Sequence, residues 1–168
     1  MRYNGLLYRA LNPVFACSPL SGLGAQLYGG RFNAKGTPAL YASLSIMTAI
    51  REANQVGSLQ PTTLVSYEAE IDPVFDGRNE AALHAEGMDT SALADPTWRD
   101  TMKVHGVAPT QAFAARLGTR GFHGLLVRSF ALGANGADLN LVLWRWGGAA
   151  PARLVLIDDE KRLSGTIT

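Results

Sequence analysis

The sequence predicts an α+β fold, in which a mixed, largely antiparallel sheet carries flanking helices. Strand-like segments occur toward both ends of the chain, and most helical segments lie between them. Three late segments, 124–130, 139–146 and 152–159, are rich in valine and leucine and follow one another with few helices between them. A doubly wound parallel sheet needs a helix in each such connection, so the pattern argues against that architecture.

The first part of the chain predicts two short strands, a long loop and a helix. Residues 6–11 (LLYRAL) and 37–43 (TPALYAS) have the composition of strands. Residues 13–30 are rich in glycine, serine and proline, and we expect a long loop there with room for one helical turn. Ser43 or Ser45 can cap the helix that follows, and Gly57 can end it.

Apolar residues in that helix recur at the spacing i, i+3, i+4, i+7, which places them on one face. We expect this face to be buried, and its members are Ile46, Ala49, Ile50 and Ala53. Glu52 lies about 100° from the centre of the face. We therefore expect its carboxylate at the rim, beside Thr48 and Ala49, where it can point into a cleft.

The middle of the chain is expected to contain one more strand, two loops and two helices. Residues 57–61 and 87–96 are predicted loops, and residues 62–71 (TTLVSYEAEI) form a predicted strand. Residues 96–106 and 109–118 are predicted helices, because each begins at a proline and ends at a glycine.

Composition indicates a globular protein and excludes several classes of function. The 168 residues are 47% hydrophobic and 17% charged, and no repeat or linker divides them, so we expect a single domain over 1–168. Fifteen basic residues against fourteen acidic ones give a net charge of +1, which argues against direct binding of nucleic acid or of an anionic membrane. No run reaches the ~20 apolar residues that cross a bilayer, and the first residues lack the apolar core of a signal peptide. We expect a cytoplasmic location.

Common cofactor and metal motifs are incomplete in this sequence. Cys17 is the one cysteine, and the three histidines do not have metal-ligand spacing, so no metal site is expected. Residues 22–27 (GLGAQL) contain G-x-G but lack the third glycine and a preceding strand, so a Rossmann site is not expected. Residues 138–140 (DLN) begin like a calcium loop but lack its final glutamate.

One short stretch, 29–53 (GGRFNAKGTPALYASLSIMTAIREA), brings together three residues with useful chemistry. Arg31 follows two glycines, which let a backbone approach a ligand closely. Tyr41 closes the strand that leads into the helix with Glu52. Each residue alone is more often ordinary surface or packing, but together we expect them to converge on one ligand. Arg9 and Ser129 are candidate helpers.

The order of motifs also resembles a known family. Y-R occurs at 8–9, and G-G-R-F-N-x-x-G-x-P-x-L-Y-x-S occurs at 29–43, before the helix with Glu52. G-x-x-G-L-L-V-x-S follows at 121–129, and N-L-V-L-W at 140–144. This arrangement resembles the RES domain, which is named for its Arg, Glu and Ser and is found in toxins of bacterial toxin–antitoxin pairs. Arg128 departs from the pattern, because a small residue or proline is expected before the serine.

The resemblance implies a fold similar to that of ADP-ribosyltransferase toxins and a cleft that binds NAD and breaks its nicotinamide–ribose bond. It implies catalytic roles for Arg31, Tyr41 and Glu52. The residues that it places at NAD are Arg9, Arg31, Tyr41, Ser129 and Asn140. NAD would be consumed as a substrate, with no further cofactor. The resemblance also implies a cognate antitoxin, often with a helix-turn-helix DNA-binding part.

These residue types fit such a reaction. Loss of nicotinamide builds positive charge on the ribose, as in glycoside hydrolysis, and a carboxylate such as Glu52 stabilises that charge. An arginine fork matches pyrophosphate or ribose oxygens, and a tyrosine ring can stack on nicotinamide. Several alternatives stay open: water, phosphate or a protein as acceptor of ADP-ribose, a homodimer, and a non-catalytic module that inhibits or scaffolds a partner protein.

Overall fold

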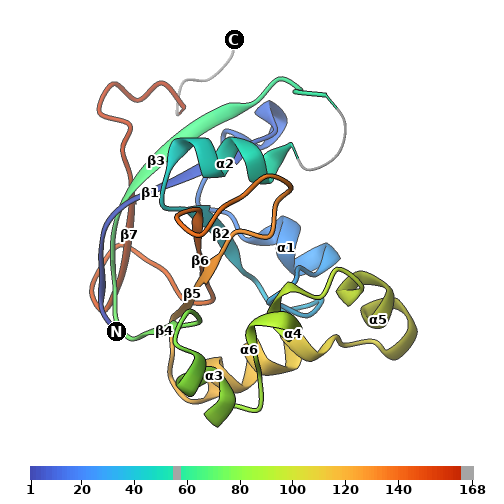
Figure 1. The fold of residues 1–168 in the computed structure, drawn as a ribbon. Coiled ribbons are helices and arrows are strands. Elements are labelled where there is room, and N and C mark those ends of the chain that lie inside the picture. Colours follow the sequence, from blue (N-terminus) through green and yellow to red (C-terminus); the bar gives the residue numbers. More distant parts are fainter. Residues whose placement is uncertain (55–57, 164–168) are drawn as a thin grey trace.

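A computed structural model describes residues 1–54 and 58–163. Within them, seven strands form one sheet in the order β4-β5-β6-β2-β1-β3-β7 (Figure 1). The strands are β1 (Tyr3–Leu11), β2 (Leu40–Ser43), β3 (Thr63–Ile71), β4 (Val74–Asp76), β5 (Gly124–Arg128), β6 (Leu139–Leu143) and β7 (Ala152–Leu156). The β4–β5 pair is parallel and the other pairs are antiparallel, which confirms the predicted α+β class and its mixed, largely antiparallel sheet.

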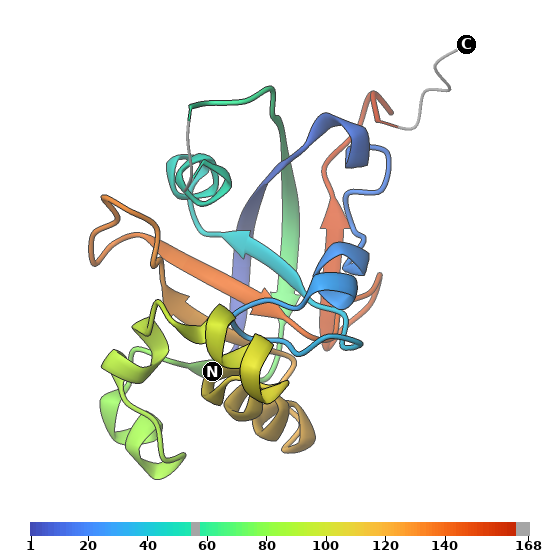
Figure 2. The same cartoon turned by 90° about the vertical axis from the view of Figure 1, so that its right-hand side faces the viewer.

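Five of the α-helices lie at two places on the sheet. α2 packs on β1, whereas α3 to α6 gather at the end formed by β4 and β5 (Figures 1 and 2). The helices are α1 (Leu23–Tyr28), α2 (Ile46–Ala53), α3 (Glu80–Ala85), α4 (Thr90–Ala94), α5 (Trp98–His105) and α6 (Pro109–Thr119), together with a short 3-10 helix, η1 (Pro13–Phe15). Among the described residues, no helix is long and apolar enough to cross a membrane.

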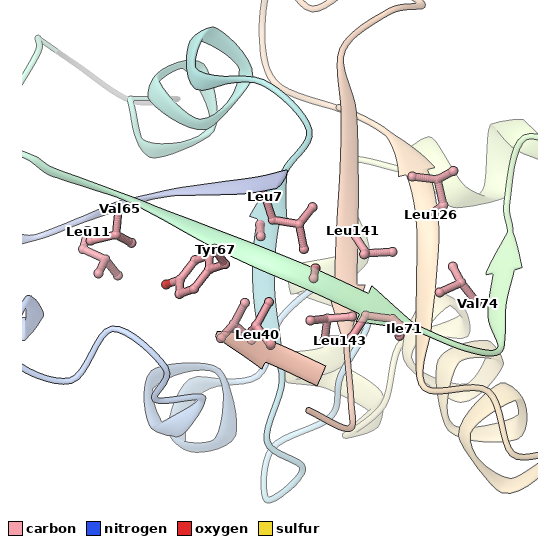
Figure 3. Close-up of a cluster of buried hydrophobic side chains, with 13 residues drawn as sticks. Leu7, Leu11, Leu40, Val65, Tyr67, Ile71, Val74, Leu126, Leu141 and Leu143 are labelled. Carbon is pink, nitrogen blue, oxygen red and sulfur yellow. The ribbon is translucent and has the colours of Figure 1, made fainter. Parts of the chain in front are cut away.

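Two clusters of buried side chains cover the two faces of the sheet. Leu126 and Leu141 belong to the cluster drawn in Figure 3, whereas their neighbours Leu125 and Val142 belong to the cluster that packs on the helices. Successive side chains of a strand point to opposite faces, so β5 and β6 are buried on both. This burial explains why the two segments are rich in valine and leucine.

Some predicted element boundaries are wrong. The predicted strand 37–43 begins only at Leu40, and the predicted strands 139–146 and 152–159 end at Leu143 and Leu156. The predicted loop 87–96 contains α4, which begins because the Asp89 side chain accepts a hydrogen bond from the Ala92 N–H at 2.7 Å. The very short α3 and β4 were not predicted.

Helix ends follow the local capping chemistry. Ser45, rather than Ser43, caps α2 by accepting a hydrogen bond from the Thr48 N–H at 3.1 Å. α2 ends at Ala53 with Asn54 as its C-cap, and the predicted terminator Gly57 lies outside the described residues. Gly106 ends α5 with a φ of 80°, as predicted, but α6 continues through Gly118.

The predicted buried face of α2 is wrong in part: Ala49 is buried and Ile50 half-buried, but the other two members are exposed. Ile46 is 46% exposed and Ala53 is exposed, whereas Thr48 and Ala49 are buried. The physical reason is a polar partner: the Thr48 hydroxyl donates a hydrogen bond to the buried Asp138 carboxylate at 2.6 Å. α2 therefore turns a polar side toward the protein, and Glu52, one helical turn after Thr48, points to the same side.

Candidate functional site

A pocket of about 500 Å³ opens beside α2, over the centre of the sheet. Its volume is in the range of small-molecule sites. The predicted site residues that line it are Arg9, Arg31, Tyr41, Glu52 and Asn140. They come from β1, the turn before β2, β2 itself, α2 and β6, so the fold brings together segments from most of the chain.

Two hydrogen bonds hold the Glu52 carboxylate in this pocket. The Ser129 hydroxyl donates to Glu52 Oε1 at 2.5 Å, and the Asn140 side-chain amide donates to the same oxygen. Bonds to a charged acceptor are roughly twice as strong as bonds between neutral groups. The carboxylate therefore has a fixed position, which a solvated helix glutamate lacks.

Sheet register directs the Asn140 amide toward Glu52. β2 and β6 pair Ser43 directly with Asn140, which places their side chains on the same face of the sheet. The Ser43 hydroxyl donates to Asn140 Oδ1 at 2.7 Å. Because this bond occupies the oxygen of the amide, its nitrogen faces Glu52.

Ser129 contacts the pocket residue Glu52 without being among the described residues that line the pocket. It is 9% exposed. Its backbone N–H donates to the Asp138 carbonyl at 2.7 Å, and its hydroxyl accepts from the Ala131 N–H at 3.2 Å while donating to Glu52. The structure thus brings Ser129 to the carboxylate of Glu52.

Arg31 is anchored by two backbone carbonyls and two aromatic rings. Nη1 donates to the backbone carbonyls of Leu93 at 3.1 Å and Asp95 at 2.6 Å. The guanidinium carbon lies 4.7 Å from the ring centroid of Phe130 and 5.8 Å from that of Trp98, which are cation–π distances. Burial is the largest cause that lowers the pKa of Arg31, although a guanidinium stays protonated at neutral pH.

The hydroxyl of Tyr41 is used within the protein. It donates to Asn33 Oδ1 at 2.8 Å and accepts from the Phe32 N–H at 3.0 Å, so it fastens the turn that carries Arg31. Burial raises the pKa of Tyr41 well above its ordinary value. The residue lines the pocket, while its hydroxyl is directed to these two partners.

The two positions before Arg31 each require glycine, for different structural reasons. Gly29 has a φ of 73°, a conformation that favours glycine. A Cβ atom on Gly30 would lie 2.4 Å from the Tyr41 hydroxyl oxygen. The sequence-based interpretation attributed both glycines to a ligand, whereas Gly30 is needed for the close approach of Tyr41.

Arg9 joins the pocket to the long N-terminal loop. Its Nη1 donates to the backbone carbonyls of Pro19 at 3.0 Å and Ser21 at 3.1 Å. Arg9 therefore orders the segment before α1. Two residues of α1 itself, Gly24 and Ala25, line the pocket.

The charge of the pocket is strongly unbalanced. Of the described residues that line it, one is an acid, Glu52, and four are basic: Arg9, Arg31, Arg99 and Arg128. Arg128, the departure from the family pattern, is exposed at the end of β5. Four guanidinium groups at one pocket favour an anionic ligand, and phosphate oxygens are good acceptors for a guanidinium.

Sequence reasoning missed several residues of the site. Trp98 and Arg99 belong to α5, and the Arg99 guanidinium carbon lies 4.8 Å from the Trp98 ring centroid. Nothing in the local sequence of that helix indicates a site. Ser43 was considered as a helix cap and ends the 29–43 motif, but it was not assigned to the site; its place in that motif was a usable signal.

A family model described as RES domain matches residues 6–164, and the chain belongs to this family. A protein called Toxin Res from Yersinia enterocolitica is 31% identical over 99 residues, which cover 59% of this chain and 64% of the relative. Another Toxin Res, from Photorhabdus laumondii, is 43% identical over 47 residues, which cover 28% of this chain and 30% of the relative. The chain thus spans less than two thirds of either curated relative.

A solved structure shares the fold. A chain in the crystal structure of the M. tuberculosis MbcT-MbcA toxin-antitoxin complex superposes with a TM-score of 0.66 and 20% sequence identity. The superposition covers 94% of this chain and 84% of that chain. At this identity the likeness concerns the fold.

Proposed function

We propose that this protein is the toxin of a toxin–antitoxin pair, and that it binds NAD and breaks the nicotinamide–ribose bond. The observation that carries the proposal is the Glu52 carboxylate, held by Ser129 and Asn140 in a pocket whose other charges are arginines. Membership of the RES domain family, the names of the two relatives and the shared fold support it.

The arginines account for binding of the dinucleotide. NAD carries an anionic diphosphate, which a guanidinium binds through two parallel hydrogen bonds. Arg31 is rigid, because two carbonyls and two aromatic rings fix it, so little side-chain entropy is lost on binding. Arg99 and Arg128 add positive charge at the same pocket.

Glu52 accounts for the chemistry. As nicotinamide leaves, positive charge builds on the ribose, and a carboxylate beside the sugar stabilises this transition state more than the ground state. Its two donors fix the carboxylate before the substrate arrives, which avoids reorganisation during the reaction. The ring of Tyr41 provides a surface for nicotinamide, while its hydroxyl holds the turn before β2.

The acceptor of ADP-ribose defines the finer activity. Water gives a glycohydrolase, phosphate a phosphorylase, and a protein side chain an ADP-ribosyltransferase. NAD labelled in its adenosine half, incubated first with pure protein and then with a bacterial lysate, distinguishes free ADP-ribose, its phosphorylated form and labelled protein. Release of nicotinamide in any of these incubations supports the proposal.

The alternative is a non-catalytic module that inhibits or scaffolds a partner. It predicts that pure protein and protein in lysate release no nicotinamide while a partner is still captured. That result would overturn the enzymatic proposal. Calorimetric titration of the same protein with NAD would show whether the module still binds the dinucleotide.

A toxin of this kind requires a neutralising antitoxin, and the solved complex with the same fold contains such a pair. Expression of the chain alone is expected to stop growth, and co-expression of the product of an adjacent gene is expected to restore it. Abundant expression without slowed growth would contradict the toxin role.

A further inference from the structure

Asp138 lies just before β6, and its side chain contacts α2 and the loop between β5 and β6. Its Oδ1 accepts hydrogen bonds from Thr48 Oγ1 at 2.6 Å and Arg51 Nη1 at 2.7 Å, and its Oδ2 accepts from the Asn135 N–H at 2.8 Å. Asp138 is 7% exposed and is not among the described residues that line the pocket. A buried carboxylate with this many donors is a strong local constraint.

Asp138 is connected to Glu52 through α2 and through both hydrogen-bond donors to the Glu52 carboxylate. Thr48 and Arg51 are on α2, the helix that carries Glu52. The backbone carbonyl of Asp138 accepts from the Ser129 N–H at 2.7 Å, and Ser129 donates to Glu52. Asn140, the second donor to Glu52, follows Asp138 by two residues in the same chain segment.

α2 packs on β1, but few of its apolar side chains are buried there. It is eight residues long, Ile46 and Met47 are 46% and 62% exposed, and Thr48 and Ala49 are its buried residues. A short helix is only marginally stable without packing of an apolar face. Its polar attachment to the loop between β5 and β6, which lies against α2 in both views, must therefore supply much of its orientation (Figures 1 and 2).

We infer that Asp138 is a positioning residue that sets the location of the Glu52 carboxylate in the pocket. It binds the helix of Glu52 through its side chain and the backbone of Ser129 through its carbonyl. This inference rests on the proposed function for its catalytic consequence, while the geometric consequence is independent of it.

The first test is Asp138→Asn, which keeps the shape of the side chain but replaces one carboxylate oxygen by an amide that cannot accept the Asn135 N–H. We expect kcat for nicotinamide release to fall about 10- to 100-fold, because a misplaced catalytic group has effects of this order. KM for NAD should change less than about threefold, since the arginines of the pocket are untouched.

Asp76→Asn is the matched control. Asp76 also binds an arginine, Arg78 at 2.8 Å, but it lies on β4 away from the pocket. The kcat of Asp76→Asn should therefore equal that of the wild type.

The second test is a double-mutant cycle. If Asp138 acts through Glu52, Asp138→Asn should lower kcat no further in a Glu52→Gln background, because coupled residues are not additive. Thr48→Val should reproduce the loss of kcat, and Thr48→Ser, which restores the hydroxyl donor to Asp138, should recover it. Full additivity of the two substitutions would overturn the inference.

A third measurement separates this inference from the proposed function. Amide hydrogen exchange is expected to speed up in residues 46–53 and 129–140 of Asp138→Asn, while exchange in α6 is unchanged. Failure of wild-type protein to release nicotinamide would overturn the proposed function alone. Unchanged exchange in both segments would overturn the positioning role of Asp138, whatever the enzyme assay shows.

Discussion

Asn140 donates a hydrogen bond to the Glu52 carboxylate although 88 residues separate them in the sequence. The bond depends on the pairing of β2 with β6, because Ser43, the strand partner of Asn140, occupies the oxygen of the same side-chain amide. Glu52 is thus held by the central strands of the sheet rather than by its own helix alone. The chemistry of the pocket and the register of the sheet are therefore linked.

We predict that Arg31→Ala weakens NAD binding by about 2–4 kcal/mol, the cost of removing one partner of a partly buried charged pair. Arg31→Lys should restore little of this affinity, because an ammonium group cannot form the two-pronged contact or reproduce the guanidinium contacts with Phe130 and Trp98. Calorimetric titration with NAD measures the effect. Thermal melting must accompany it, since Arg31 also binds the carbonyls of Leu93 and Asp95. Equal affinity in wild type and Arg31→Ala would contradict the assignment.

Tyr41→Phe should affect stability more than turnover. The substitution keeps the ring but leaves Asn33 Oδ1 and the Phe32 N–H without their partner, which should cost about 1–3 kcal/mol of unfolding free energy. Turnover per folded molecule should stay within a few-fold of wild type. Urea unfolding and nicotinamide release on one preparation test both parts. A large loss of turnover in a stable Tyr41→Phe protein would assign the hydroxyl to the reaction instead.

Gly30→Ala should destabilise the protein by about 1–3 kcal/mol, the usual cost of an extra methyl group in a packed site. The new Cβ would lie 2.4 Å from the Tyr41 hydroxyl and 2.6 Å from Asn33 Oδ1, so the turn must shift. Gly118→Ala is the matched control. A Cβ there meets no atom within 4 Å and the residue is inside α6, so alanine should stabilise by about 0.5–1 kcal/mol. Opposite shifts of the urea midpoint are expected, and a neutral Gly30→Ala would show that the turn is not tightly packed.

The sequence predicted most strands of the sheet, because buried strands have recognisable runs of apolar residues. β5 and β6 pack on both faces, which demands the continuous valine and leucine runs that made them recognisable. It was wrong in part on α2, where the i, i+3, i+4 spacing predicted burial of Ile46 and Ala53, which are exposed, and missed Thr48. The buried side of α2 was set by Asp138, a residue 90 positions away from Thr48, and no local pattern records such a contact.

The same distinction holds for the site. Arg31, Tyr41 and Glu52 could be predicted because they lie in one short stretch, and the structure brings them to one pocket. The role of the Tyr41 hydroxyl could not, because it depends on how the turn at Gly30 folds back onto β2. Trp98 and Arg99 reach the pocket from α5, and only the tertiary fold places them there.

Acid should destabilise the protein through carboxylates whose pKa values are lowered in the fold. Hydrogen bonds from Arg78 to Asp76 and from Thr48 to Asp138 are the largest causes that lower these two pKa values. Because the folded pKa lies below the unfolded value of about 4, this stabilisation is fully present above that value and is lost as pH falls through the folded pKa. The melting temperature should therefore fall progressively below about pH 4. Asp138→Asn should have a shallower fall over this range, and a slope identical to wild type would contradict the contribution of Asp138.

Glu52→Gln tests the central role in the proposed chemistry. Glutamine keeps an oxygen that can accept from Ser129 and Asn140, so the fold and the melting temperature should be preserved, but the charge is removed. If the carboxylate stabilises positive charge that exists only in the transition state, turnover should fall about 10²–10³-fold while NAD affinity changes little. Growth inhibition should disappear as well. Nicotinamide release, calorimetric titration with NAD and thermal melting on the same two preparations separate these effects. Near-wild-type turnover in a well-folded Glu52→Gln protein would show that Arg31, Tyr41 and Glu52 share a pocket without sharing a reaction.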